Sequence, residues 1–347
     1  MEKDQAYGIH LATNIQKRHF QLIHLTPNKI SDHTAGDVAD DFYHRYKVSN
    51  SEIICNGFRL SISWPRVIPT GKLRRGVNKA GIAFYNSVIN HLIPNTGITP
   101  FVTIFHWDRP QPLEDEYGGF LSPRLIFWIS QSFVSMNFGD RVKHWATFNE
   151  PWTFSQGKLT LLSQKGHIGT VLVPHWFVPC SNSKADIETA QRAPDFMYGW
   201  FLDPLVFGDY PKSMRGLVGK RLPKFTPEQS KLVKGFLDFL GLNYYTANTH
   251  YNELKLEPLY FKFSPFTAMR NGKPIGEPEG VPIFFVYPKG LREILVYTKN
   301  RYNNPPVYVT ENGMGEANIT TVKQGVKDYQ RVRFYRNHLK AVKEAIG

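Results

Sequence analysis

Two glutamates that could act as an acid, a base or a nucleophile each follow a short strand-forming run. Glu150 comes after Trp145-Ala146-Thr147-Phe148-Asn149, and Pro151 ends that strand because proline cannot donate to a sheet ladder. Glu311 comes after Val307-Tyr308-Val309-Thr310. Hydrolysis of a glycosidic bond needs two carboxylates, one to protonate the leaving oxygen and one to attack the sugar carbon or activate water. For either glutamate alone, a strand cap or an ion pair with arginine explains the pattern equally well.

The sequence around both glutamates resembles a known enzyme family. The resemblance rests on Thr147-Phe148-Asn149-Glu150-Pro151 and Tyr308-Val309-Thr310-Glu311-Asn312-Gly313, which in this order are similar to the paired signatures of family-1 glycoside hydrolases, the retaining β-glucosidases. Two further segments resemble the plant branch of that family. They are Phe105-His106-Trp107-Asp108 and Asp115-Glu116-Tyr117-Gly118-Gly119-Phe120-Leu121. The resemblance extends in patches from about Pro27 to Gly347. It implies a (β/α)8 TIM barrel, a small-molecule β-glucoside as substrate, and no metal or organic cofactor.

The resemblance also implies a role for five residues. Glu150 is the general acid and then the base, and Glu311 is the nucleophile. Tyr245 binds at the substrate site and hydrogen-bonds the nucleophile, while Asn243 supports the acid/base site. Arg59 lies under the nucleophile and keeps it ionised, because an opposite charge lowers the pKa of a carboxylate. Thioglucosidase relatives carry Gln at the position of Glu150, so this glutamate favours an O-β-glucoside.

For some of the candidate residues, a purely structural role is an alternative to the functional role. His106 ends an apolar run on the same rim as Glu150, so we expect it, with Asn149, to bind sugar hydroxyls; a core histidine bonded to a carbonyl is the alternative. Asn243 and Tyr245 share a face of the expected strand by its period of two, for which core polar packing is the alternative. For Arg59 the alternative is a solvated edge residue.

Length and composition are those of one large α/β domain. The 347 residues are 41% hydrophobic and 14% aromatic, which suffices for a single barrel spanning 1–347, with an irregular segment at 1–26. A net charge of +13 could attract nucleic acid. The basic residues are scattered, with no run longer than Lys72-Leu73-Arg74-Arg75, so we expect no nucleic-acid partner. Cys55 and Cys180 lack the number and spacing of a disulfide framework or a metal site, and we expect buried thiols.

Periodicity, together with the family resemblance for the strand at 238–246, predicts six strands and six helices. The expected strands are Gly57–Trp64, Ile98–Trp107, Trp145–Asn149, His167–Val173, Asp238–Thr246 and Val307–Thr310. The expected helices are Asn78–Ile93, Ile126–Val134, Ala185–Trp200, Pro227–Phe236, Leu291–Tyr302 and Asp328–Ile346. By the resemblance, these strands correspond to family strands two to seven. We therefore predict an incomplete barrel in which strands 1 and 8 are missing.

An incomplete barrel has consequences for function. Two open sheet edges predict self-association and low stability, and missing sugar ligands predict weak hydrolysis. An inactive remnant that acts as a binding or regulatory protein, or has no function, is therefore the alternative to an enzyme. No stretch is long enough to cross a membrane, and no signal-like apolar run follows Met1-Glu2-Lys3-Asp4. We expect no membrane partner, and the sequence does not indicate a compartment.

Overall fold

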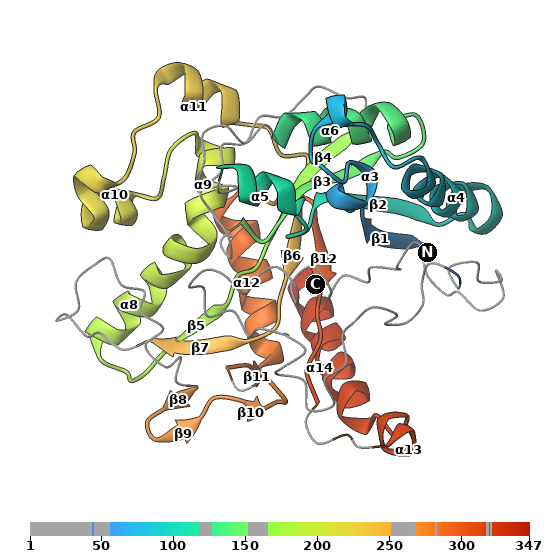
Figure 1. Ribbon diagram of the computed structural model, residues 1–347. Coiled ribbons are helices and arrows are strands. Elements are labelled where there is room, and N and C mark those ends of the chain that lie inside the picture. Colours follow the sequence, from blue (N-terminus) through green and yellow to red (C-terminus); the bar gives the residue numbers. More distant parts are fainter. Residues whose placement is uncertain are drawn as a thin grey trace. The chain divides into compact units, whose positions relative to one another are not determined.

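The computed structural model describes residues 44, 56–117, 127–151, 166–250, 268–281, 283–316, 319 and 321–347 (Figure 1). The chain divides into two compact units, which are described separately. Unit 1 comprises Met1–Asn149 and Phe154–His167, and unit 2 comprises Glu150–Thr153 and Ile168–Gly347. The expected irregular segment at 1–26 and Cys55 lie outside the described residues.

Unit 1 contains three parallel strands that match the first three expected from the sequence. They are β1 (Gly57–Ser61), β2 (Thr99–Phe105) and β3 (His144–Asn149). Leu60 pairs with Val102, and Val102 pairs with Trp145. Strands β2 and β3 are almost wholly buried, as is typical of nearly continuous apolar strands in a parallel sheet. Strand β1 is shorter than predicted, because Trp64 already begins a helix.

The helices of unit 1 are α3 (Trp64–Val67), η3 (Leu73–Arg75), α4 (Lys79–Thr96), α5 (Gln111–Tyr117) and α6 (Phe127–Phe138). The Asn78 side chain caps α4 by accepting from the Ala80 amide, as predicted. The sequence pattern predicts that Pro94 with Gly97 stops this helix. The helix runs through Pro94 and ends at Gly97, which adopts the left-handed conformation, so the predicted end at Ile93 is three residues too early. Helix α6 also runs four residues beyond the predicted end at Val134.

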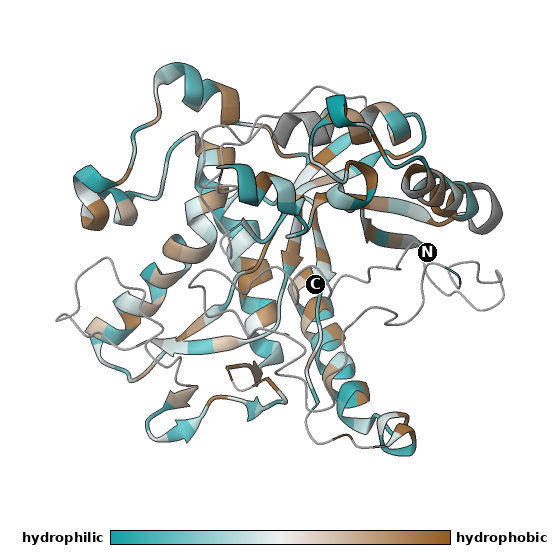
Figure 2. Ribbon diagram, viewed as in Figure 1, coloured by the Kyte–Doolittle hydropathy of each residue, from teal (hydrophilic) through white to brown (hydrophobic). Residues whose placement is uncertain are grey.

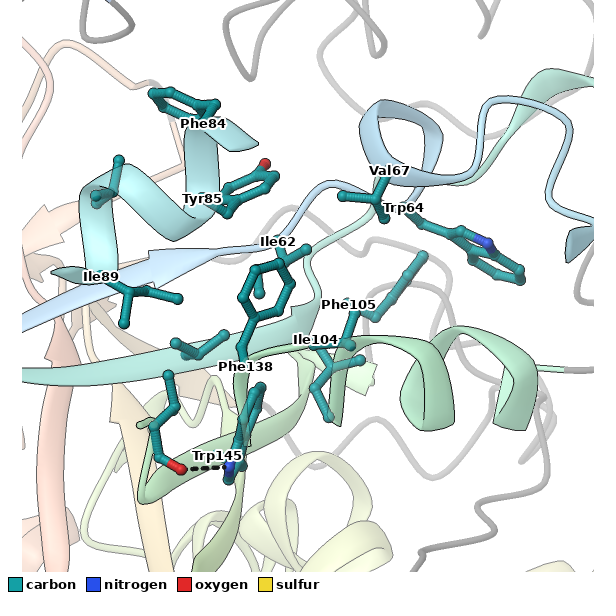
Figure 3. Close-up of a cluster of buried hydrophobic side chains, with 14 of the residues drawn as sticks. Ile62, Trp64, Val67, Phe84, Tyr85, Ile89, Ile104, Phe105, Phe138 and Trp145 are labelled. Atoms are coloured by element: carbon teal, nitrogen blue, oxygen red, sulfur yellow. Dashed lines mark hydrogen bonds between the residues drawn. The ribbon is translucent and has the colours of Figure 1, made fainter. Parts of the chain in front are cut away.

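The core of unit 1 lies between its strands and helices (Figure 3). Ile62, Phe105 and Trp145 come from the strand side, and they pack with Ile89 of α4 and Phe138 of α6. The one polar atom of Trp145 is satisfied, since its indole nitrogen donates to a backbone carbonyl 3.1 Å away. Each fully buried side chain of this size contributes roughly 1.5–3 kcal/mol to folding. This core therefore holds the carboxyl end of β3 in place.

Unit 2 contains the other three expected strands. They are β4 (His167–Leu172), whose first residue falls in unit 1, β6 (Phe239–Asn243) and β12 (Val307–Glu311). Strand β6 lies in the middle and pairs in parallel with both neighbours. It ends at Asn243, so the predicted strand to Thr246 is too long. A further parallel pair, β5 (Trp176–Pro179) and β7 (Ala247–His250), was not predicted.

Helices and short hairpins complete unit 2. The helices are α8 (Lys184–Pro194), the π-helix η5 (Asp195–Gly199), α9 (Trp200–Phe207), α10 (Lys212–Val218), η6 (Gly219–Arg221), α11 (Pro227–Val233), α12 (Pro288–Arg301), α13 (Val322–Gly325) and α14 (Tyr329–Ile346). The hairpins are β8 (Met269–Arg270) with β9 (Lys273–Pro274), and β10 (Glu277–Pro278) with β11 (Phe285–Val286). Thr226 caps α11 with Gln229 in a capping box, as the sequence indicated for Thr226.

Helices α12 and α14 lie side by side in unit 2. The buried face of α14 is Phe334, His338 and Ala341. Cys180 is a buried free thiol, as expected. Across the described part of the chain, none of the helices combines the length and apolar character needed to cross a bilayer. The same residues contain no group of three or more His, Cys, Asp or Glu side chains placed to hold a metal ion.

Candidate active site

Glu150 lies immediately after β3 and is buried, with 6% of its surface exposed. Its φ is 49°, in the left-handed region that non-glycine residues seldom adopt. Its amide donates to the Val171 carbonyl at 2.8 Å, which anchors this turn to β4 within unit 2. Strained backbone of this kind persists where the surrounding structure over-determines it, and it clusters at functional sites. The turn places the Glu150 carboxylate among the residues of unit 2.

The Glu150 carboxylate is held by Asn243, the last residue of β6. Asn243 Nδ2 donates to Glu150 Oε1 at 2.6 Å. Thr310 Oγ1 donates to Asn243 Oδ1 at 2.7 Å, so the carbonyl end of the amide is occupied and the amino end must face the carboxylate. Asn243 is completely buried. A buried, oriented amide of this kind fixes the position and direction of the Glu150 carboxylate.

Glu311 ends β12 and is held by Tyr245. The Tyr245 hydroxyl donates to Glu311 Oε2 at 2.5 Å. The register of β12 on β6 shifts between Val309 and Glu311, so that Glu311 pairs with Asn243. The Tyr244 amide then donates to the Glu311 carbonyl at 3.0 Å. The shift therefore sets Glu311 beside the residue that holds Glu150.

Tyr245 lies two residues past the end of β6. The prediction that both residues lie on this strand is therefore wrong for Tyr245, but each side chain reaches a carboxylate. The Tyr245 ring stacks on Phe284 at 5.6 Å with an interplanar angle of 11°. Phe284 contacts the buried His175 edge-on. Aromatic packing thus holds the phenol whose hydroxyl donates to Glu311.

Within unit 2 the two carboxylates have different environments. Glu150 is buried and bonded to an amide, whereas Glu311 is half-buried and bonded to a phenol. They are joined through Asn243, which bonds Glu150 directly and pairs with Glu311 across the strands. Two carboxyl groups of unlike environment are what a paired acid and nucleophile require.

Unit 1 brings together Arg59 and Asn149. Arg59 donates to Asn149 Oδ1 at 2.7 Å and to Thr103 Oγ1 at 3.2 Å. The Trp107 indole donates to the Asn149 carbonyl at 3.0 Å. Asn149 is almost completely buried. Arg59 is therefore half-buried and hydrogen-bonded rather than a solvated edge residue, and it orients the residue that precedes Glu150. Its expected role beneath Glu311 stays a prediction.

His106 follows β2 in unit 1 and is half-buried. Its amide donates to Asp108 Oδ1 at 3.4 Å. Burial raises the pKa of Asp108 to about 7 despite hydrogen bonds from Ser63 and backbone amides. Trp107 lies between them with a φ of 72°. The left-handed turn at Trp107 lets its indole reach Asn149 while His106 keeps a partly open ring.

Four residues of these groups were not singled out by sequence reasoning. They are Thr310, Trp107, Asp108 and Phe284. The signal for Thr310 was a hydroxyl in an otherwise apolar strand, and the signal for Trp107 and Asp108 was their place in the quoted motif. Phe284 stood in an aromatic loop, and nothing in its local pattern points to Tyr245, 39 positions earlier in the sequence.

Comparisons with known proteins agree with these arrangements. The sequence matches the family described as "Glycosyl hydrolase family 1" over residues 16–161 and 158–347. Furcatin hydrolase of Viburnum furcatum is 48% identical, over 93% of this chain and 70% of that protein. Beta-glucosidase 12 of Oryza sativa subsp. indica is 46% identical, over 93% of this chain and 75% of that protein.

Solved structures agree with the sequence matches. A rice β-glucosidase in a covalent complex with Glc has a TM-score of 0.83 and 33% identity, covering 99% of this chain and 82% of that one. This likeness relates the parallel strands of both units to a (β/α)8 TIM barrel. The chain therefore belongs to glycosyl hydrolase family 1.

Proposed function

We propose that this protein is a retaining hydrolase of O-β-glucosides. The observation that carries the proposal is the arrangement in unit 2, where Asn243 bonds Glu150, Tyr245 bonds Glu311, and Asn243 pairs with Glu311 across the strands. Its relatives include proteins named furcatin hydrolase and beta-glucosidase, which supports a glucoside as substrate.

In the proposed mechanism, Glu150 donates its proton to the glycosidic oxygen while Glu311 attacks the anomeric carbon. The bond to the aglycone breaks, and a covalent glycosyl-enzyme forms on Glu311. Glu150, now ionised, removes a proton from water, which displaces Glu311 and releases the sugar with its original configuration. A retaining site of this kind requires the two carboxyl groups to be about 5–5.5 Å apart.

The other predicted residues position the sugar and the carboxylates. His106 and Asn149 bind sugar hydroxyls, and Arg59 holds the Asn149 side chain ready for this. Tyr245 keeps Glu311 oriented for attack. Placing a substrate well is worth several kcal/mol of barrier, so each of these residues acts on rate rather than on stability.

We also propose that hydrolysis is weak. None of the described strands corresponds to family strand 1 or 8, which by the resemblance carry a Gln, a Trp and a Glu that hold the sugar, and a loosely held sugar gains little from its acid. The wide exposure of the apolar residues Tyr308 and Val309 on β12 supports an unfinished barrel. If the loss of sugar ligands abolishes catalysis completely, the protein is an inactive remnant that acts as a binding or regulatory protein or has no function.

The test is hydrolysis of p-nitrophenyl β-D-glucoside by the purified chain, with Glu311→Gln as its matched control. We expect a slow release of nitrophenol that the control lacks, and early NMR spectra should show the β-anomer of glucose first. Release that persists in Glu311→Gln would contradict the assigned nucleophile. Early α-anomer would contradict the retaining mechanism, and a rate equal to that of an intact relative would contradict the proposed weakness.

A further inference from the structure

The hairpin of β10 and β11 in unit 2 supports the residue that holds Glu311. Figure 2 shows β11 as hydrophobic and β10 as hydrophilic. Phe284, which precedes β11, stacks on Tyr245, and the Tyr245 hydroxyl donates to Glu311. Thr246 anchors this arm of the hairpin, because its hydroxyl accepts from the Phe285 amide at 2.9 Å. The hairpin therefore supports the hydrogen bond to the nucleophile carboxylate.

The same hairpin also contacts the 312–316 loop, which follows the nucleophile along the chain. The Gly315 amide donates to Glu279 Oε2 at 3.1 Å, and the Gly280 amide donates to the Gly315 carbonyl at 3.1 Å. Glycine allows this approach, because a Cβ atom at Gly315 would lie 2.9 Å from the Val281 side chain and 3.3 Å from its backbone nitrogen. Both backbone polar groups of Gly315 are therefore bonded to the hairpin.

These two contacts close a ring of interactions around the nucleophile. On one side, Glu311 is bonded to Tyr245, which stacks on Phe284. On the other side, the chain itself leads from Glu311 to Gly315, which is bonded to Glu279. The Glu279 amide joins the two sides, since it donates to the Phe284 carbonyl at 3.4 Å. Glu279 is thus the side chain through which the hairpin holds the loop next to Glu311.

The two carboxyl oxygens of Glu279 have different surroundings. Oε2 accepts from Gly315, whereas Oε1 is buried and has no hydrogen-bond partner among the described residues. Burial raises the pKa of Glu279 to about 7, although the bond from the Gly315 amide acts in the opposite direction. A hydrogen bond to an ionised acceptor is roughly twice as strong as one to a neutral acceptor. The bond between Glu279 and Gly315 therefore weakens as the pH falls through neutrality.

The charged side chains on the adjoining segments pair with other groups. On the same hairpin, Glu277 pairs with Arg333 of α14 at 2.6 Å. On the 312–316 loop, Glu316 pairs with Arg331 of α14 at 3.6 Å. Within the described ranges, no ion pair includes Glu279, and the group that its carboxyl accepts from is a backbone amide. The ionisation of Glu279 is therefore governed by burial and by the loop that it holds.

We propose that Glu279 is a positioning residue, which holds the 312–316 loop through the Gly315 amide when it is ionised and loosens that loop when it is protonated. The inference rests on the proposed function, because the loop follows directly on the nucleophile Glu311. Glu279 acts through the loop and not on the sugar. The ionised form favours attack by Glu311, since small misplacements of a reacting group cost rate.

The first test compares kcat/KM for p-nitrophenyl β-D-glucoside between the unchanged chain and Glu279→Gln. Glutamine keeps the shape and an acceptor oxygen but carries no charge. The ratio of variant to unchanged chain should be close to one at about pH 5.5 and fall to roughly one tenth at about pH 8.5. Taking this ratio cancels the titrations of Glu150 and Glu311. Phe284→Leu, which removes the other side of the ring, should lower kcat/KM by the same factor at every pH.

The matched control is Glu277→Gln, which removes one negative charge from the same hairpin at an exposed pair with Arg333. Its kcat/KM should stay within about twofold of the unchanged chain at every pH, because exposed ion pairs contribute little. A ratio for Glu279→Gln that does not change with pH would overturn the proposal. An equal change in Glu277→Gln would do the same, since it would show that charge alone is responsible.

The second test does not depend on activity. In the full chain labelled with nitrogen-15 glycine, one amide signal should move with a midpoint near pH 7. This movement should be lost in Glu279→Gln and kept in Glu277→Gln. An active chain in which no glycine signal behaves in this way would refute the proposed role of Glu279. A chain that shows the titrating signal but hydrolyses no glucoside would confirm the contact of Glu279 with the loop and contradict the proposed function instead.

Discussion

At the scale of single residues, the surroundings of Glu150 and Glu311 favour different catalytic roles. Glu150 is buried, has one oxygen bonded to Asn243, and sits on a left-handed turn that sets its direction. Glu311 is more open and accepts from Tyr245. A proton donor gains from burial and a fixed direction, whereas a nucleophile needs access to the sugar carbon. The local environments therefore support Glu150 as the acid and Glu311 as the nucleophile.

Replacing Glu150 by Gln should depend on the leaving group. An alkyl β-glucoside needs its oxygen protonated, so its turnover should fall by roughly 10²–10⁴. p-Nitrophenyl β-D-glucoside leaves as a stable phenolate, and its first step should fall much less. The measurement is kcat/KM of Glu150→Gln for the two substrates. The control is Glu311→Gln, which should lose activity on both substrates. Equal losses in Glu150→Gln would mean that Glu150 is not the acid.

Removing the Tyr245 hydroxyl should lower the rate while leaving the fold intact. Tyr245→Phe keeps the ring that stacks on Phe284 but loses the hydrogen bond to Glu311. A hydrogen bond to a charged group contributes roughly 1.5–3 kcal/mol, so kcat/KM should fall by about 10- to 100-fold. The control is Tyr244→Phe, whose buried hydroxyl donates to the Tyr287 carbonyl. That variant should lose stability instead, and a matching loss of kcat/KM in both would refute the prediction.

His175 should make the stability of unit 2 depend on pH. Burial lowers its pKa from 6.5 to about 4, so the folded state keeps it neutral where the unfolded chain binds a proton. Its contribution is complete above pH 6.5 and is lost as the pH falls to 4, by an amount on the order of 3 kcal/mol. His175→Gln should flatten the free energy of unfolding over this range, measured with urea.

The control for this prediction has the opposite sign. Burial raises the pKa of Asp108 from 3.8 to about 7, so the folded state keeps this carboxyl protonated. Its contribution is greatest below pH 3.8 and is lost as the pH rises to 7. Asp108→Asn should therefore remove a fall in stability with rising pH. Parallel changes in the two variants would show that the slopes come from elsewhere.

At the scale of elements, the sheet of unit 2 depends on close contact between β4 and β6. A Cβ atom added at Gly169 would come within 2.6 Å of the Phe239 carbonyl oxygen, which belongs to the backbone and cannot turn away. The two strands approach at Gly169 because glycine leaves room for that carbonyl. The same sheet then carries Asn243 and Glu311 at its carboxyl end.

Gly169→Ala should therefore lower the free energy of unfolding by about 1–3 kcal/mol, the usual cost of overpacking. The matched control is Gly57→Ala in β1, where the nearest atom would be 3.5 Å away in ordinary contact. That change should be nearly neutral or slightly stabilising, because alanine lowers the entropy of the unfolded chain. Thermal melts of both variants provide the comparison, and a Gly169→Ala protein as stable as Gly57→Ala would contradict the packing argument.

At the scale of the whole molecule, we predict that the edge strand β12 pairs with another chain. It pairs with β6 on one side, and no other strand in the described ranges pairs with it. Tyr308 and Val309 are 41% and 38% exposed. An exposed apolar edge strand with few charges is a template for aggregation. The apolar surface left open also weakens folding, at roughly 25 cal/mol per Å².

We therefore expect the chain to associate through β12 and to melt early. Val309→Lys should reduce light scattering during purification and heating, because lysine blocks edge pairing. The control is Val322→Lys in α13, which adds the same charge at an exposed valine away from the sheet. Equal effects of the two changes would mean that net charge, and not the edge, governs solubility. A soluble monomer with a sharp, reversible transition near that of intact barrels would show the expectation wrong.

The sequence by itself determined the elements and the family. Six strands and most helices followed from the period of their apolar residues and from caps such as Asn78 and Thr226, because these signals act within a few residues. The two glutamate motifs indicated the family for the same reason. Errors occurred where a local rule competed with its surroundings, as at Pro94 and at the end of β6.

The period and spacing of the sequence do not decide which side chains meet, although the family resemblance implied a contact of Tyr245 with Glu311 and of Asn243 with the acid/base site. Asn243 bonds Glu150 across 93 positions of sequence, and Tyr245 bonds Glu311 across 66. No period or spacing encodes such contacts, because they depend on strand register and on two left-handed turns. Helix α14 makes the same point about surfaces. Its apolar period is plain in the sequence, but which part of it is buried is decided by how α14 packs within unit 2.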